Sequence, residues 1–276
     1  MSVDDLGHPY TARLPATRVV SLVPSITEAL ASVCPDAVVG ATDWCVRPAD
    51  LSTTRVRGTK NPDLAAIRAL APDVVVANKE ENRALDVRRL RSAGVPVWVT
   101  EIETVPRAVE SLERLFDVAL GWPRPAWLDE ARRLWCEPVP SATSARVVVP
   151  IWRDPWMVVG SSTFTGDLLR RLGLENAFAD HPQRYPHVEV AEIEATGADV
   201  VLLPDEPYVF TADDGPEAFT LIPSQLVSGR LLTWYGPSLV EAHETFTRPP
   251  RPDWARDPRA AGSQTSAPAE TNERQA

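Results

Sequence analysis

The sequence is poor in the residues that build disulfide frameworks and metal centres. Its three cysteines, Cys34, Cys45 and Cys136, are widely spaced and odd in number, so they predict neither disulfides nor a cysteine zinc site. The four histidines show no i, i+4 pair, which argues against a zinc site with several histidine ligands. We therefore predict no metal site built by the protein's own side chains.

Long apolar runs and a signal peptide are missing as well. No stretch approaches the roughly 20 apolar residues of a membrane span. Residues 1–15 carry acids and prolines where a signal peptide has a basic region and an apolar run. As written, the chain is expected to be cytoplasmic; it would be exported only if translation starts at an upstream codon.

Basic residues are outnumbered by acidic ones, which gives a net charge of −10 at pH 7. A surface that binds phosphates needs clustered Lys and Arg, so nucleic acid is not an expected partner. The sequence also lacks a Walker loop, a G-x-G-x-x-G fingerprint, a G-x-S-x-G elbow and an H-E-x-x-H pair. Because no nucleophile–base constellation is visible, we predict no catalytic residue and no enzyme.

What the sequence does contain is an alternation of strand and helix patterns. Buried strands are predicted at 18–23, 37–41, 73–77, 95–100, 145–152 and 200–203, with amphipathic helices between them. Such alternation is typical of parallel sheets with covered faces, and so of an α/β fold. After the first strand, Ser25 and Glu28 fit a capping box, which predicts a helix start directly behind Pro24.

The second half of the chain repeats the first. Residues 64–77 align with 190–203, and Arg18-Val19-Val20 matches Arg146-Val147-Val148 at nearly the same spacing. The repeat predicts two similar parallel-sheet lobes joined by a helical connector, with a ligand cleft between them. The expected boundaries are a loose N-terminus at 1–14, an N-terminal lobe at 15–103, connecting helices at 104–137, a C-terminal lobe at 138–244 and a disordered tail at 245–276.

The candidate ligand-binding residues follow from the rule that open parallel sheets bind ligands at the carboxyl ends of their strands. Several tryptophans lie on these loops, where an indole offers a flat apolar face with one donor. Cys45 could be a soft ligand to the metal of a bound chelate or a simple packing residue. The candidates are Ser25, Trp44, Cys45, Lys79, Glu80, Asn82, Trp152, Arg153, Trp156, Tyr185, Trp234 and Tyr235.

The segments RVVSLVPSITEAL, VVGATDWC, SAGVPVWVT and WMVVGSSTFTGDLLRRLGLEN resemble the helical-backbone metal receptor superfamily. The resemblance covers about residues 18–241 and is strongest to the vitamin B12-binding and iron-siderophore-binding proteins of ABC importers. It implies two α/β lobes on a rigid helix and a non-catalytic, monomeric binding protein. The implied small-molecule ligand is a corrinoid or a ferric chelate.

The chain departs from this family pattern in three places. The family has glutamates that dock onto an importer permease, but Ala65 and Ala191 occupy those positions here, and the nearby acids Asp63 and Glu189 are out of register. Neither a signal peptide nor a lipid-anchor cysteine is present. The connector is interrupted at 121–123, which predicts two helices instead of one. We therefore predict that the protein does not dock to a permease.

Two further interpretations stay open at this point. One is a cytoplasmic enzyme or accessory factor of cofactor metabolism that uses the same cleft, with Glu80, Asp205 and Cys45 as its candidate groups. The other is a structural or regulatory partner that has lost its ligand.

Overall fold

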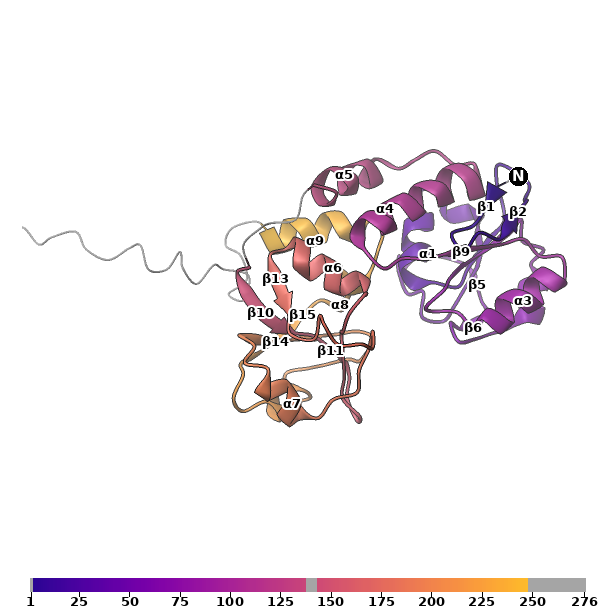
Figure 1. Cartoon of the computed structure of the whole chain (residues 1–276). Coiled ribbons are helices and arrows are strands. Elements are labelled where there is room, and N and C mark those ends of the chain that lie inside the picture. Colours follow the sequence, from indigo (N-terminus) through magenta and orange to yellow (C-terminus); the bar gives the residue numbers. More distant parts are fainter. Residues whose placement is uncertain (1, 138–142, 248–276) are drawn as a thin grey trace, which may run out of the picture.

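Two parallel β-sheets organise the chain in the computed structural model, which describes residues 2–137 and 143–247 (Figure 1). The N-terminal sheet has the strand order β5-β4-β3-β8-β9, and all its neighbouring strands pair in parallel. Its strands are β3 (Val19–Ser21), β4 (Val38–Ala41), β5 (Thr54–Arg55), β8 (Val74–Asn78) and β9 (Val97–Thr100). The predicted α/β class is confirmed.

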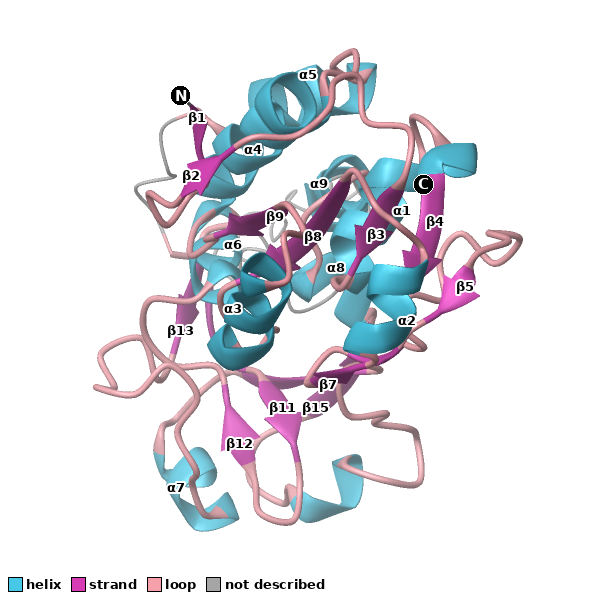
Figure 2. Ribbon diagram, turned by 90° about the vertical axis from the view of Figure 1, so that its right-hand side faces the viewer, coloured by secondary structure: helices cyan, strands magenta, loops and turns pink. Residues whose placement is uncertain are grey.

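Helices cover both faces of this sheet (Figure 2). The helices are α1 (Pro24–Ala31), α2 (Leu64–Ala69) and α3 (Ala84–Ser92). Because successive side chains of a strand point to opposite faces, Val74 and Val76 pack with α1 in one core cluster, while Val75 packs with Ile67 of α2 in another. A small antiparallel hairpin, β6 (Arg57–Gly58) with β7 (Asn61–Pro62), follows β5 and is hydrogen-bonded to the residues after the carboxyl end of β4.

The connector between the lobes consists of two helices, α4 (Val105–Arg114) and α5 (Ala126–Trp135). A π-helical turn over Leu115–Leu120 extends α4, and Gly121 ends it with a left-handed φ of 64°. The interruption expected at 121–123 is therefore present, because glycine accepts this backbone conformation without a steric penalty. Each connecting helix also contacts a helix of the C-terminal lobe, α4 against α6 and α5 against α9.

The C-terminal lobe is built on a four-stranded parallel sheet with the order β13-β10-β14-β15. Its strands are β10 (Ala145–Val148), β13 (Leu174–Asn176), β14 (Val200–Pro204) and β15 (Ser224–Val227). Its helices are α6 (Phe164–Arg171), α7 (Val190–Ala195), α8 (Gly229–Thr233) and α9 (Ser238–Thr247). An antiparallel hairpin of β11 (Pro150–Trp152) and β12 (Met157–Val158) follows β10.

The two lobes repeat one another down to individual hydrogen bonds. In each lobe the first strand lies between the second strand and a later one, β3 between β4 and β8, and β10 between β13 and β14. Asp73 Oδ2 accepts a bond from Arg18 N at 3.0 Å, and Asp199 Oδ2 accepts one from Arg146 N at 2.7 Å. Each arginine side chain also donates to the C-cap carbonyl of the helix before that later strand, of α2 before β8 and of α7 before β14. This correspondence supports internal duplication.

Both predicted chain ends need correction where the structure describes them. Residues 1–14 are not loose as a whole: β1 (Ser2–Val3) pairs with β2 (Pro9–Tyr10), and the buried carboxylates of Asp4 and Asp5 pair with Arg91 and Arg114. At the other end α9 continues to Thr247 with Phe246 buried, so the C-terminal lobe extends beyond residue 244. The rest of the predicted tail, 248–276, lies outside the described residues. Within 2–137 and 143–247, no helix has the length and apolar character of a membrane span.

Candidate ligand-binding cleft

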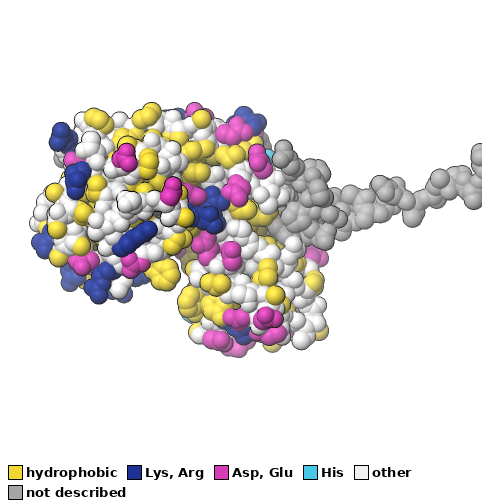
Figure 3. Space-filling view, turned by 180° about the vertical axis from the view of Figure 1, so that it is seen from behind, with side chains coloured by type: hydrophobic (Ala, Val, Ile, Leu, Met, Phe, Trp, Pro, Cys, Tyr) yellow, Lys and Arg dark blue, Asp and Glu magenta, His cyan; other side chains and the backbone are white. Residues whose placement is uncertain are grey.

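A cleft separates the two lobes, and hydrophobic and charged side chains lie along its rims (Figure 3). The loops that follow β8 and β9 meet the loop that follows β13 and enclose a pocket of about 270 Å³. Carboxyl ends of strands from both sheets therefore converge there, as the fold rule requires. The pocket is lined by Asn78, Lys79, Glu80, Glu101, Ile102, Glu103, Arg184 and Tyr185.

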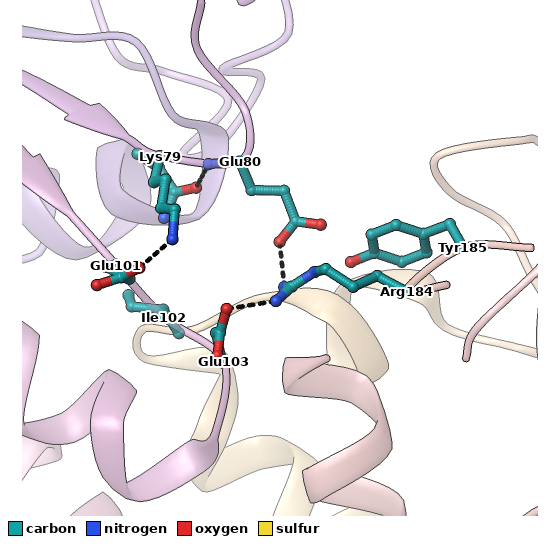
Figure 4. A pocket seen from close by; sticks show the side chains of 8 residues that line it. Lys79, Glu80, Glu101, Ile102, Glu103, Arg184 and Tyr185 are labelled. Carbon is teal, nitrogen blue, oxygen red and sulfur yellow. Dashed lines mark hydrogen bonds and ion pairs between the residues drawn. The ribbon is translucent and has the colours of Figure 1, made fainter. Parts of the chain in front are cut away.

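Ion pairs connect the charged side chains of this pocket (Figure 4). Arg184, from the C-terminal lobe, pairs with Glu80 at 3.0 Å and also with Glu103, so it joins two loops of the N-terminal lobe. Lys79 pairs with Glu101 in the same wall. Three carboxylates thus face two cations, and each of these cations already has a carboxylate partner.

Tyr185 completes the pocket from the C-terminal lobe, and its hydroxyl points toward Glu80 and Arg184 (Figure 4). Burial, together with the charge of Glu80, raises the pKa of Tyr185 well above its usual value. The phenol therefore keeps its proton at neutral pH and can donate it in a hydrogen bond to Glu80.

The loop after β8 is shaped by two asparagines. Asn78 Oδ1 accepts from Glu80 N at 2.8 Å, which is the side-chain turn that asparagine favours. Asn82 is buried, and its amide donates to the carbonyls of Leu22 and Thr59 at 3.2 and 3.0 Å. Asn82 was predicted to contact the ligand; in this structure its amide instead holds the loop that carries Lys79 and Glu80.

Two tryptophans are largely exposed on the loops of the cleft. Trp44 follows β4 and is 66% exposed, and its Nε1 lies beside Gly58 of the β6–β7 hairpin. Trp152 ends β11, is 46% exposed and makes an edge contact with Tyr208 at a centroid distance of 5.5 Å. Indoles this exposed are unusual for tryptophan and provide flat apolar surface on each lobe.

A hydrogen bond crosses between the lobes behind the pocket. The hydroxyl of buried Tyr235 donates to Glu81 Oε1 at 2.9 Å. Burial and the nearby carboxylate of Glu80 raise the pKa of Glu81 to about 7, against the opposing effects of the Tyr235 bond and of Lys60. The neighbouring Trp234 is also buried, so of this pair Tyr235 makes the polar contact with the N-terminal lobe.

The predicted capping box at the first helix is wrong. The helix α1 begins at Pro24 with Val23 as N-cap and no side-chain cap. Glu28 turns instead to the C-terminal lobe, where Arg230 donates to it at 2.7 and 3.1 Å. Ser25 is buried next to Tyr235 of the C-terminal lobe, and no described residue gives its hydroxyl a hydrogen bond of regular geometry. Both side chains of the supposed cap therefore belong to the contact between the lobes.

Three other candidates lie away from the pocket surface. Cys45 is fully buried with its sulfur 3.0 Å from the Thr27 hydroxyl, and burial raises the pKa of its thiol, so it is placed as a packing residue. Trp156 is buried against Phe210 in the core of the C-terminal lobe. Arg153 pairs with Asp214 and Glu217 of that same lobe and stacks over Trp156.

The sequence reading missed several residues that the structure brings together. Glu101 and Glu103 directly follow β9, so the rule applied to the other strands would have found them. Arg184 precedes Tyr185 in the same loop but was passed over. Glu81 lies inside the predicted 79–82 loop, yet only its contact with Tyr235, far away in sequence, distinguishes it from Glu80.

No protein-family model matches the chain. Curated relatives are identical to it at about a quarter of the aligned positions. The vitamin B12-binding protein of Salmonella typhimurium is 27% identical over 198 residues, covering 68% of this chain and 72% of the relative. That of Vibrio parahaemolyticus is 24% identical over 191 residues, covering 66% and 68%.

Solved structures of binding proteins superpose on both lobes. The periplasmic vitamin B12 binding protein of Vibrio cholerae has a TM-score of 0.67 at 18% identity and covers 83% of this chain and 94% of its own. The chain has the fold of class III periplasmic binding proteins. A periplasmic heme-binding protein from Roseiflexus shares the fold at a TM-score of 0.66 and 20% identity, covering 83% and 97%.

The comparisons confirm the resemblance to the helical-backbone receptors, and they support binding over catalysis because these relatives are binding proteins. The cytoplasmic location predicted from the N-terminus is wrong. Relatives with this fold are periplasmic, which points to an exported protein. The prediction relied on an expected leader pattern in the first residues, a weaker guide than the similarity along most of the chain.

Proposed function

We propose that the protein is an exported substrate-binding protein that holds a metal-containing macrocycle or chelate, a corrinoid above all, between its lobes. The observation that carries the proposal is the pocket built jointly by Glu80 and Glu103 of one lobe and by Arg184 and Tyr185 of the other. A ligand placed there touches both lobes at once. The binding of vitamin B12 by the curated relatives supports this choice of ligand.

The exposed indoles suit the apolar part of such a ligand. Trp44 and Trp152 belong to opposite lobes and are exposed well beyond what an aromatic core residue shows. A flat ring system between them would bury apolar area on both its faces, while the polar pocket receives its substituents. This division into an apolar surface and a few convergent polar groups is typical of small-molecule sites.

The alternative of an enzyme that uses the same cleft finds less support. Its candidate groups are already engaged: the Cys45 thiol is buried, Glu80 pairs with Arg184, and Asp205 accepts a bond from Gly229 N at 2.7 Å. None of the three pairs with another to form a nucleophile and its base, which acid–base or covalent catalysis needs.

We also propose that the two acids near the family docking positions do not replace the missing glutamates. Ala65 and Ala191 are exposed in the first turns of α2 and α7, where they offer no charge. Asp63 Oδ1 caps α2 by accepting from two backbone amides, and Glu189 forms a capping box at α7. Bidentate docking onto an arginine needs both oxygens of a carboxylate, and each of these carboxylates already caps a helix. Reconstitution with an importer tests this: stimulated ATPase activity that disappears in Asp63→Ala and Glu189→Ala would contradict it.

The experiment for the binding function is an absorbance titration of the purified ligand-free protein with cyanocobalamin, hemin and a ferric catecholate. We expect saturable binding of at least one, weakened about ten- to a hundred-fold by Trp44→Ala or Trp152→Ala if each is a central contact. Trp127→Ala is the matched control, because Trp127 lies on the connector helix α5. Absence of binding by the wild type, or equal losses in the control variant, would overturn the proposal.

A further inference from the structure

Both cations that line the pocket, Lys79 and Arg184, already have carboxylate partners, and a further carboxylate, Glu81, lies beside the pocket. In the pocket wall Arg184 and Lys79 are each paired with glutamates, as described above. Next to that wall Glu81 has no ion-pair partner in the described structure, and its bond from Tyr235 uses only Oε1. The other oxygen, Oε2, accepts no hydrogen bond from a described residue and is not among the buried unpartnered atoms, so it keeps contact with solvent.

Glu81 directly follows the pocket-lining Glu80 and is partly exposed. It follows β8, a central strand of the N-terminal sheet, and Glu80 beside it lines the pocket. Lys60, in the turn of the β6–β7 hairpin, donates to the backbone carbonyl of Glu80 at 2.6 Å and leaves Glu81 unpaired. Tyr235 closes the site from the opposite lobe.

We infer that Glu81 is a specificity-determining residue, whose free carboxylate oxygen accepts a hydrogen bond from an amide or cationic substituent of the ligand and repels a carboxylate there. The inference rests on the proposed function. Glu81 would discriminate between two classes of metal macrocycle: those whose side chains are amides, as in corrinoids, and those whose side chains are carboxylates, as in heme. Among the residues that line the pocket, an anionic substituent would have to displace a glutamate from Arg184 or Lys79 to find a cation, whereas an amide can donate to the free oxygen of Glu81.

The ionisation of Glu81 predicts a second observable, the pH dependence of ligand binding. The titratable and charged groups that face it are Tyr235 from the C-terminal lobe, Glu80 from its own loop and Lys60 from the hairpin. A hydrogen-bond donor on the ligand stabilises the charged form of Glu81, so an amide ligand should bind more tightly as the pH rises and Glu81 ionises. Below the pKa that Glu81 has in the ligand-free protein, binding of the amide ligand should therefore release protons. A carboxylate ligand shows the opposite trend, because ionised Glu81 repels it.

The test compares two corrinoids with the same ring and metal, dicyanocobinamide with amide side chains and dicyanocobyrinic acid with carboxylates. We expect the wild type to bind the amide form at least about ten-fold more tightly than the carboxylate form, as the strength of a charged hydrogen bond predicts. Its affinity for the amide form should also be higher near pH 8 than near pH 6. Glu81→Gln should reduce the preference about ten-fold and remove the pH dependence. Glu110→Gln, on the exposed face of α4, is the control for loss of one negative charge.

The outcomes separate the inference from the proposed function. A wild type that binds neither corrinoid overturns the inference, and it overturns the proposed function as well only if hemin and the ferric catecholate are not bound either. A wild type that binds both equally, or a Glu81→Gln variant that folds and keeps the full preference, overturns the inference alone. Tyr235→Phe covers the case in which Glu81→Gln does not fold: it retains the charge of Glu81 and should keep the preference for amides, and a Tyr235→Phe variant that binds both forms equally would contradict the inference.

Discussion

The ion pair between Glu28 and Arg230 gives the sharpest stability prediction, because it joins the lobes where little water reaches it. Both side chains are about one-seventh exposed, at 15% and 13%, and Arg230 donates to Glu28 from Nε and Nη2. Removing one partner of a buried ion pair costs about 3–5 kcal/mol, since the other charge stays buried and unpaired.

For Glu28→Ala we expect a loss below that range, about 2–3 kcal/mol, because Arg230 keeps a second partner in the exposed Glu241. Arg230→Ala should cost more, since it strands Glu28 without a cation. Urea unfolding followed by circular dichroism measures both losses. Glu130→Ala, which breaks an exposed pair on α5, is the matched control and should change stability by less than about 0.5 kcal/mol.

A double-mutant cycle decides whether the pair itself is responsible. The Glu28→Ala/Arg230→Ala double variant should lose clearly less than the sum of the single losses, by about 1–3 kcal/mol, because it leaves no unpaired charge. Strict additivity of the two losses would refute the reasoning. Packing between the lobes, and not the ion pair, would then hold them together.

Three further predictions concern the contact between the lobes, the N-terminal hairpin and the pH dependence of stability. Small-angle scattering should give nearly the same radius of gyration with and without ligand, because Arg184, Tyr235 and Arg230 already tie the lobes together; a marked contraction would argue for a hinge. Asp5→Ala should lower the unfolding free energy by about 3 kcal/mol, since it strands Arg114 and frees the β1–β2 hairpin, and an unchanged denaturation midpoint would contradict that. Burial raises the pKa of both Glu81 and Glu206 to about 7, so the folded state binds protons more tightly than the unfolded state, and stability should fall as pH rises from about 4.5 to about 7. Glu81→Gln and Glu206→Gln should each flatten that slope, and a slope unchanged in both variants would show that other groups cause it.

The fold could be predicted from the sequence because its signals are local or repeated. Buried strands such as Val74–Asn78 are continuous apolar runs, and the shared residues around Asp73 and Asp199 point to two lobes of one design. Gly121 likewise predicts the break in the connector, because glycine readily adopts the left-handed conformation that ends a helix.

The candidate site was only partly predictable, because loop position does not determine side-chain direction. Lys79, Glu80 and Tyr185 reach the pocket, whereas Cys45 and Trp156, on equally plausible loops, turn into the core. Burial there depends on partners far away in sequence, such as Phe210 for Trp156. The capping-box reading of Glu28 failed for the same reason, since its partner Arg230 is supplied by the other lobe.

The most direct test of the central claim is the position of the ligand's metal in a crystal of the complex. Crystals grown with a cobalt corrinoid, or with an iron chelate that the titration selects, locate the metal by its anomalous scattering. The account predicts one peak between the lobes, flanked by Trp44 and Trp152 and adjacent to the pocket of Arg184 and Glu80. A peak elsewhere on the protein, with the cleft holding only water, would contradict it.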